Sequence, residues 1–93
     1  MIKWNNSKTN DLIEAVLALK TKDEAKRFLR DLMTEAEIVE FGNRWKAARM
    51  LNKNIPYTTI VKQTGLSSTT IARVSQWLRN GMGGYKLMLS RIK

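Results

Sequence analysis

Apolar residues recur at spacings of three and four along almost the whole chain, which is the period of an α-helix with one buried face. These stripes predict helices over about residues 10–20, 21–32 and 34–52, and another from about residue 85 to the end. Residues 57–78 carry two further helical stripes with a turn between them. The pattern therefore predicts an all-α protein of six helices.

Three of the predicted helices begin at recognisable capping residues. Thr9 or Asn10 is the expected N-cap of the first helix, because its side-chain oxygen can accept a free backbone N–H. The segments Thr21-Lys-Asp-Glu24 and Thr34-Glu-Ala-Glu37 have the capping-box pattern. In a capping box the threonine side chain accepts a hydrogen bond from the backbone N–H of the glutamate, and the glutamate side chain reaches back to a backbone N–H at the cap. The two segments predict the starts of the second and third helices.

Residues 57–78 have the pattern of a helix-turn-helix. A short helix stops at Gly65, because glycine adopts a positive φ without a steric penalty. Leu66 is the expected apolar plug of the turn, and Ser67 is the expected N-cap of the second helix. The apolar side chains that we expect to be buried on the two helices are Ile60, Val61, Ile71, Val74 and Leu78.

The side chains on the opposite face of the second helix are small or polar, and Arg73 is the prominent charged residue among them. Small side chains let a helix enter a DNA major groove, and an arginine can donate two hydrogen bonds to a guanine edge. Lysine and arginine nearby would contact backbone phosphates. The residues that we expect to contact DNA are Lys53, Lys62, Ser67, Ser68, Thr69, Ala72, Arg73, Gln76 and Arg79.

Charge is distributed very unevenly along the chain. It carries 17 Lys and Arg against 8 Asp and Glu, a formal net charge of +9. Seven basic and all eight acidic residues precede position 41, net −1, whereas the rest holds ten basic residues and no acid, net +10. A one-sided basic half is typical of phosphate binding, because each neutralised phosphate releases a condensed counterion. The charge pattern therefore predicts double-stranded DNA as the partner.

Composition argues against several other classes of protein. Without cysteine or histidine the chain has no disulfide, no zinc-knuckle ligands and no imidazole base. No phosphate-binding glycine loop or nucleophile elbow occurs, and a Ser–Lys dyad is the only catalytic arrangement left open. The longest apolar run, residues 15–19, is too short to span a membrane. We expect a cytoplasmic, nucleoid-associated protein that is not an enzyme and needs no cofactor or metal.

Ninety-three residues predict a single domain, 1–93, with a small core. Residues 9–52 and 85–93 carry more apolar surface than packing against one helix-turn-helix would bury, so we expect them to form a dimerisation core. Residues 57–80 would then be the DNA-reading head. A homodimer would present two such heads to two half-sites one helical turn apart.

Two other interpretations stay open from the residues alone. The protein could bind nucleic acid without sequence specificity, as an architectural protein, or its basic half could dock on an acidic protein. The outer face of the second helix argues against the second of these, because a protein-binding surface would favour exposed tryptophan, tyrosine or leucine there.

Four segments of the chain have a recognisable sequence: Leu32-Met-Thr-Glu-Ala-Glu-Ile38, residues 44–51, Gly65-Leu-Ser-Ser-Thr-Thr-Ile-Ala-Arg-Val74 and Leu78-Arg-Asn-Gly-Met-Gly-Gly-Tyr85. Through them, residues 20–92 resemble the Trp repressor superfamily, most closely its Trp-repressor-like (YerC/YecD-type) branch. The resemblance implies a six-helix chain in an intertwined homodimer with two reading heads. It also implies a bacterial transcriptional regulator, a repressor.

The resemblance further suggests candidate effector residues. Thr34, Arg44 and Arg73 match residues that surround the bound amino acid in the tryptophan-responsive repressor. Val74 departs from that pattern, because the repressor has a glycine there that makes room for the indole ring, and a valine takes up that volume. We therefore expect constitutive DNA binding or another small-molecule effector rather than tryptophan.

Overall fold

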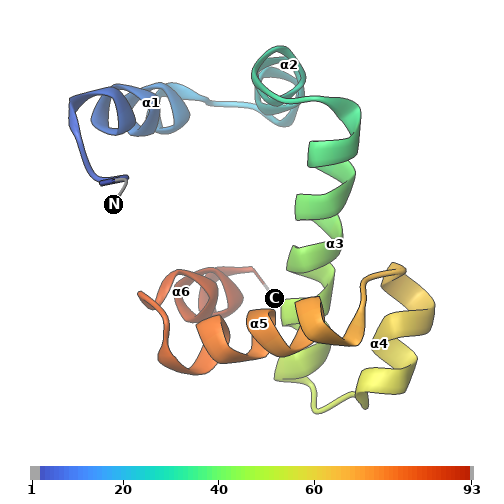
Figure 1. Ribbon diagram of the computed structural model, residues 1–93. Helices are drawn as coiled ribbons and strands as arrows, with labels where there is room; N and C mark the ends of the chain where they lie inside the picture. The colour runs from blue at the N-terminus through green and yellow to red at the C-terminus, as the bar shows by residue number, and fades with distance from the viewer. Residues whose placement is uncertain (1–2, 93) are drawn as a thin grey trace. The chain divides into compact units, whose positions relative to one another are not determined.

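The computed structural model describes residues 3–92, which contain six helices and no strand (Figure 1). The helices are α1 (Ser7–Ala18), α2 (Lys22–Leu32), α3 (Glu35–Asn52), α4 (Tyr57–Thr64), α5 (Ser68–Asn80) and α6 (Gly84–Arg91). The predicted all-α, six-helix architecture is confirmed. The chain forms two compact units that meet within α3, Met1–Ile38 and Val39–Lys93. The predicted organisation as one domain stays a prediction.

Helix α1 begins three residues earlier than the hydrophobic pattern indicated. Its N-cap is Asn6, whose side-chain oxygen accepts a hydrogen bond from the backbone N–H of Thr9 at 3.0 Å. The hydroxyl of Thr9 donates to the carbonyl oxygen of Trp4. The prediction of Thr9 or Asn10 as the cap was wrong, because an asparagine upstream of the apolar stripe already satisfies a free donor at the helix start.

Both capping boxes are present as predicted. The N–H of Glu24 donates to the hydroxyl oxygen of Thr21 at 3.1 Å, and the Glu24 carboxylate accepts from the N–H of Lys20 at 2.9 Å. At the start of α3, the N–H of Glu37 donates to the Thr34 hydroxyl oxygen at 3.1 Å, and the Thr34 N–H donates to the Glu37 carboxylate at 2.9 Å. These bonds fix the starts of α2 and α3.

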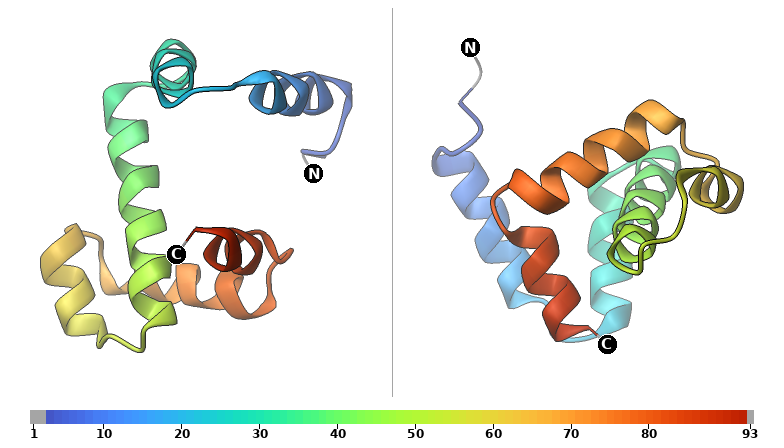
Figure 2. Two further views of the ribbon diagram at one scale, coloured as in Figure 1. Left: turned by 180° about the vertical axis from the view of Figure 1, so that it is seen from behind. Right: turned by 90° about the horizontal axis from the view of Figure 1, so that it is seen from below.

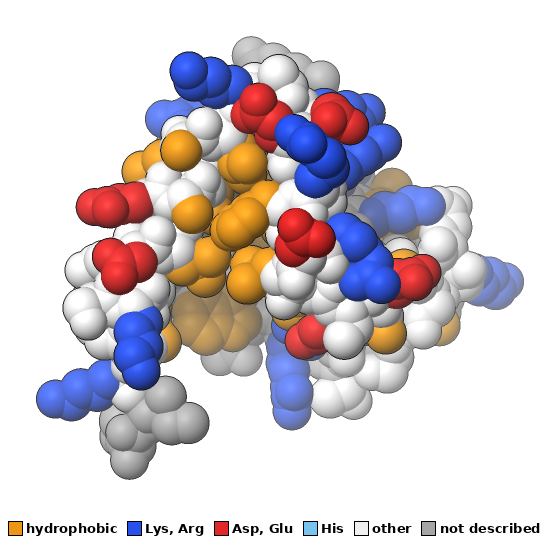
Figure 3. Space-filling model, turned by 90° about the horizontal axis from the view of Figure 1, so that it is seen from above, with side chains coloured by type: hydrophobic (Ala, Val, Ile, Leu, Met, Phe, Trp, Pro, Cys, Tyr) orange, Lys and Arg blue, Asp and Glu red, His pale blue; other side chains and the backbone are white. Residues whose placement is uncertain are grey.

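The first unit has little core of its own. Neither α1 nor α2 buries a residue, and the apolar stripe of α1 lies at the surface, with Leu17 78% exposed. Hydrophobic side chains are accordingly visible on the surface in Figure 3, among acidic and basic ones. Apolar side chains at helical spacing that find no cover within the chain indicate a contact surface.

The core lies in the second unit, where the C-terminal part of α3 meets α4 and α5. Figures 1 and 2 show α4 and α6 on opposite sides of that part of α3, with α5 crossing it. Alanines on α3 allow the close approach of α5, since they add little volume between the helix backbones. The buried hydrophobic residues are Ala47, Ala48, Met50, Ile60, Leu66, Ile71 and Val74.

The predicted core of the helix-turn-helix is confirmed at most positions. Ile60 and Ile71 are fully buried, and Leu66 plugs the turn at 6% exposure. Val61 and Leu78 are only half-buried: Val61 lies beside the inner face of α4, and Leu78 lies near the C-terminal end of α5. Among residues 3–92, no helix has the length and apolarity that crossing a membrane requires.

Candidate nucleic-acid interface

The turn between α4 and α5 has the geometry that its sequence predicts. Gly65 has φ +73°, and its N–H donates to the carbonyl oxygen of Val61 at 2.9 Å. The buried hydroxyl of Thr64 donates to the carbonyl oxygen of Ile60 at 2.7 Å and accepts from the N–H of Leu66 at 3.2 Å. Thr64 thus satisfies backbone groups on both sides of the glycine, which makes the turn rigid.

Ser67 is the N-cap of α5, as predicted. Its hydroxyl oxygen accepts from the backbone N–H of Thr70 at 3.1 Å and lies 3.0 Å from the Thr70 hydroxyl. The Ser67 side chain is therefore engaged in the cap, and the first turn of α5 leaves Ser68 and Thr69 exposed beside it. Free backbone donors at a helix start favour an anion such as a DNA phosphate.

The outer face of α5 is open to solvent at every position predicted to contact DNA. Its exposed residues are Ser68, Thr69, Ala72, Arg73, Gln76 and Arg79. Lys62 is exposed on α4, one turn before the glycine. Lys53 lies elsewhere, near the C-terminal end of α3, where it borders a hollow with Lys46 and Arg49. The structure thus brings together the α5 residues, whereas Lys53 borders a different hollow.

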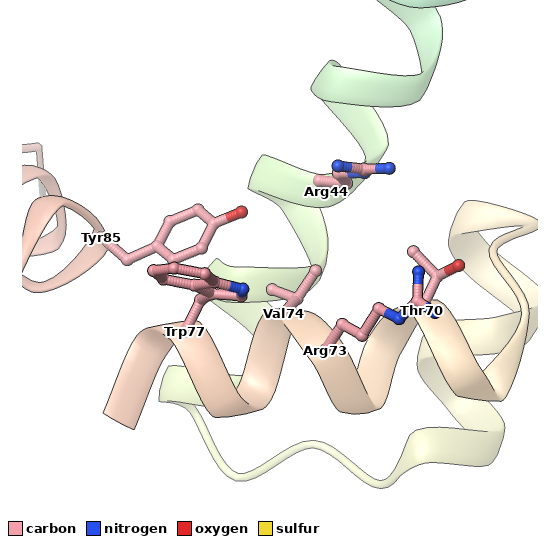
Figure 4. Close-up of a pocket in the computed structure, with 6 residues that line it drawn as sticks. All are labelled: Arg44, Thr70, Arg73, Val74, Trp77 and Tyr85. Atoms are coloured by element: carbon pink, nitrogen blue, oxygen red, sulfur yellow. The ribbon is translucent and has the colours of Figure 1, made fainter. Parts of the chain in front are cut away.

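A cavity of about 260 Å³ lies beside Arg73, between α3, α5 and α6 (Figure 4). The Arg73 side chain runs along α5 toward Thr70, and Arg44 reaches from α3 toward the same space. Two guanidinium groups therefore border one cavity, which makes it suited to an anion. Its lining residues are Arg44, Thr70, Arg73, Val74, Trp77 and Tyr85.

Arg44 is held in place by its own helix. Its Nε and Nη2 both lie 3.1 Å from Oε2 of Glu40, and its guanidinium carbon lies 5.5 Å from the centre of the Phe41 ring. Glu40 is the last acidic residue of the sequence. Past this pair, all charges of the second unit are positive, so the unit attracts phosphate from a distance.

Thr34, the third candidate effector residue, does not line this cavity. It belongs to the first unit, and its hydroxyl oxygen and N–H both bond Glu37. These two bonds hold the pKa of Glu37 below its ordinary value of 4.5, and the bond from the Thr34 backbone has the larger effect, followed by that of the Thr34 hydroxyl. Within one chain, Thr34 therefore acts as a helix cap.

Sequence reasoning missed three lining residues of the cavity. Thr70 and Trp77 lie three residues before and four after Arg73, so helical spacing alone could have placed them on its flank. Tyr85 comes from another helix and needed the tertiary structure. Its ring stacks on that of Trp45, with centroids 6.3 Å apart and an interplanar angle of 14°.

Trp77 lies in an apolar stripe of α5 but is not a core residue. Its side chain is 60% exposed, whereas Trp45 is half-buried against the core. Among residues 3–92, no group of three or more His, Cys, Asp or Glu could hold a metal ion.

The fold and this interface define the class of the protein: an all-α chain whose helix-turn-helix exposes a polar, basic second helix. The chain belongs to the Trp repressor protein family, which it matches over residues 7–93. This is the fold of DNA-binding regulators, and the resemblance noted in the sequence is confirmed.

Individual relatives agree over nearly their whole length. YerC, an uncharacterized protein of Bacillus subtilis (strain 168), is 36% identical over 91 residues, which cover 98% of this chain and 88% of YerC. A TrpR-like protein from Eubacterium eligens ATCC 27750 superposes with a TM-score of 0.92 at 35% identity, covering 96% of this chain and 92% of that one. A proposed Trp repressor from Staphylococcus aureus gives 0.90 at 29% identity, covering 99% and 95%.

Proposed function

We propose that this chain is a sequence-specific, double-stranded DNA-binding transcriptional regulator, a repressor, that acts as a homodimer. The observation that carries the proposal is the outer face of α5, where small and hydroxyl side chains lie beside Arg73, in a half of the chain that has no acid after Glu40. The family and the relative described as a proposed Trp repressor support the same function. Binding to operators would keep the protein on the nucleoid of a bacterial cytoplasm.

Different side chains of α5 would make different contacts with DNA. Ser68, Thr69 and Ala72 are short enough to let the helix backbone approach the floor of a major groove. Arg73 and Gln76 project from the same face and are the side chains long enough to reach base edges there. Lys62, on α4, and Arg79, late in α5, would contact backbone phosphates on either side of the groove.

The homodimer is supported by apolar side chains that the single chain leaves uncovered. In the second unit these include Val39, Phe41, Trp77 and Met82, which are 62%, 46%, 60% and 77% exposed. The first unit adds the apolar stripe of α1, described above. Apolar surface on this scale, at helical spacing, is what the interface of an obligate dimer covers.

In this proposal no effector is needed to complete the reading face, because the start of α5 is capped by its own Ser67 side chain. Val74, 3% exposed, fills part of the space between α3 and α5, and the cavity beside it is bordered by the chain's own Trp77 ring. We propose that DNA binding does not require tryptophan. A different small anion in the cavity would have to share Arg73 with the DNA.

Selection of bound duplexes from random DNA tests the function directly. A two-fold symmetric consensus, with half-sites about one helical turn apart, is the expected result for a homodimeric reader. Equal binding of selected and random duplexes would instead identify a non-specific, architectural protein. Failure to bind any duplex, with retention on an acidic protein, would identify a protein-interaction module.

Salt dependence provides an independent measurement of the same contact. A dimer that touches about 6–10 phosphates should lose about 10³–10⁵ in affinity between 50 and 200 mM salt. A titration that stays flat over this range would rule out phosphate contact as the source of the affinity. Light scattering of the free protein at the same concentrations gives the mass, which should be that of two chains.

A further inference from the structure

A second concentration of positive charge lies away from α5, on the C-terminal part of α3. Lys46, Arg49 and Lys53 border one hollow of about 250 Å³, to which α4 contributes Gln63. Lys46 and Arg49 lie three residues apart on one face of α3, and Lys53 follows four residues later in the turn directly after the helix, so the three cations form a stripe about 10 Å long. We call Lys46, Arg49, Lys53 and Gln63 the α3 basic stripe.

No negative charge within the second unit offsets this stripe. Its three cations take part in none of the ion pairs found among residues 3–92, and the one acid of the second unit, Glu40, pairs with Arg44. All three side chains are exposed. Like charges placed side by side repel each other, so this arrangement lowers stability unless an anion binds there.

The stripe faces away from the surface that we propose reads DNA. Ala47 and Ala48 are fully buried in the core shared with α4 and α5. Arg49 lies about 160° around α3 from Ala47, at 100° per residue, and therefore on its outer side. A duplex seated on the outer face of α5 is thus separated from the stripe by the core itself.

We propose that the α3 basic stripe is a second phosphate-binding surface, which holds the backbone of a DNA segment other than the one under α5. The proposal rests on the proposed DNA-binding function and extends it. The segment is either the flank of the same duplex, bent around the protein, or a second duplex. Both sources offer the same chemistry, a row of phosphates.

The chemistry of the stripe favours DNA over an acidic protein. A length of about 10 Å matches about three phosphates of one strand, which follow each other every 3.4 Å along the duplex axis. The only apolar residues of the hollow are Met50 and Ile55, of which Met50 is buried and Ile55 half-buried. No aromatic side chain borders it, so it lacks the tryptophan or tyrosine anchors that protein partners favour.

A capture experiment on the full chain tests the proposal. A biotinylated duplex of about 20 base pairs, carrying both selected half-sites, is saturated with protein and then offered a fluorescent duplex of unrelated sequence. In parallel, affinity is compared between the short selected duplex and one extended by about 20 base pairs on each side. The first arm detects a second duplex, and the second arm detects the flank of the same one.

The double variant Lys46→Gln/Arg49→Gln removes two cations of the stripe, and Lys22→Gln/Lys26→Gln removes the same charge from exposed positions of α2. The wild type and the α2 variant should show capture or a gain with the longer duplex. In the stripe variant the gain should be smaller by about tenfold or more. The slope of log affinity against log salt concentration, measured for the second segment, should fall by about 2 in magnitude. Binding of the short duplex should stay within about twofold in both variants, because neither touches the α5 face.

Each other result overturns the proposal. Equal capture and equal length gain by the stripe variant and the wild type would show that Lys46 and Arg49 bind no DNA. A wild type that holds the short duplex but neither captures a second nor gains from length would leave the proposed function intact and remove this inference alone. Capture of polyglutamate in preference to the second duplex would assign the stripe to an acidic protein. A wild type that binds no duplex would remove both proposals.

Discussion

Gly81 packs so closely on Trp77 that a Cβ atom at position 81 would clash with the Trp77 carbonyl oxygen and lie 2.7 Å from Cε3 of its ring. The N–H of Gly81 donates to that same carbonyl oxygen at 2.9 Å and ends α5. The end of α5 and the position of the exposed indole therefore both depend on the glycine at position 81.

The first prediction follows from this contact. Gly81→Ala should lower the free energy of unfolding by about 1–3 kcal/mol, because the added methyl meets backbone that cannot move aside. Gly42→Ala is the matched control, since Gly42 lies inside α3 with nothing within 4 Å of a new Cβ. It should raise stability by about 0.5–1 kcal/mol. Denaturant melts at one protein concentration measure both, and equal effects would contradict the clash.

Gly65 should matter for a different reason, its backbone conformation. No atom lies within 4 Å of a Cβ built there, but φ is +73°. Gly65→Val should therefore cost about 1–2 kcal/mol or more, through backbone strain alone. Gly65→Asn should cost less, because asparagine tolerates the left-handed region. If thermal melting shows no difference between the two variants, strain at φ is not what Gly65 relieves.

Glu37 should make the stability of the α3 start depend on pH. Its pKa lies below 4.5 in the folded chain because the Thr34 backbone N–H, and then the Thr34 hydroxyl, bond its ionised form. The stabilisation is thus present above pH 4.5 and is lost as the pH falls through the lowered pKa. An NMR titration of the Glu37 carboxyl carbon measures the value directly.

Thr34→Ala separates the two causes, because it keeps the backbone donor and removes the hydroxyl. The Glu37 pKa should then rise only part of the way to 4.5. A pKa unchanged from the wild type in Thr34→Ala would show that the hydroxyl contributes nothing.

Arg73 should contribute to specificity as well as to affinity. Arg73→Ala should weaken binding of the selected duplex by about 1–3 kcal/mol and relax the preference at one position per half-site, if the contact is to a base edge. Arg79→Ala should instead weaken binding to all sequences by a similar factor, as expected of a phosphate contact. Competition between the selected duplex and its single-base variants distinguishes the two outcomes. A uniform loss with Arg73→Ala would assign Arg73 to a phosphate.

Tryptophan should have no effect on the wild type. Val74 takes volume beside the cavity, so calorimetry should show no saturable tryptophan binding, and DNA affinity should be the same with and without the amino acid. Val74→Gly should lose about 1 kcal/mol or more of stability, because a buried side chain is removed and a helix residue becomes glycine. Saturable tryptophan binding by the wild type, with tighter DNA binding in its presence, would show that Val74 does not block the ligand.

Local chemistry made much of this fold predictable from the sequence. Thr21 and Thr34 begin their helices because a hydroxyl and a glutamate three residues later satisfy free donors wherever the rest of the chain lies. Gly65 ends α4 because glycine readily adopts the positive φ of a helix C-cap, and this preference does not depend on the rest of the chain. The cap of α1 was misplaced because Asn6 lies in a polar leader, where the apolar stripe gives no indication of the first helical residue. The face of α5 that carries Arg73 followed from the spacing of Ile71 and Val74.

The sequence by itself therefore determined the helices, the turn and the basic half of the chain, because these depend on neighbours within four residues and on composition. Only the tertiary structure decided that Tyr85 joins Arg44 and Arg73 around one cavity, and that Lys46, Arg49 and Lys53 border a different hollow. Such pairings join separate helices, and helical periodicity carries no information about which face of one helix packs on another. The packing of α3 on α4 and α5 through Ala47 and Ala48 supplies that information, since two small side chains let the helices meet on that face alone.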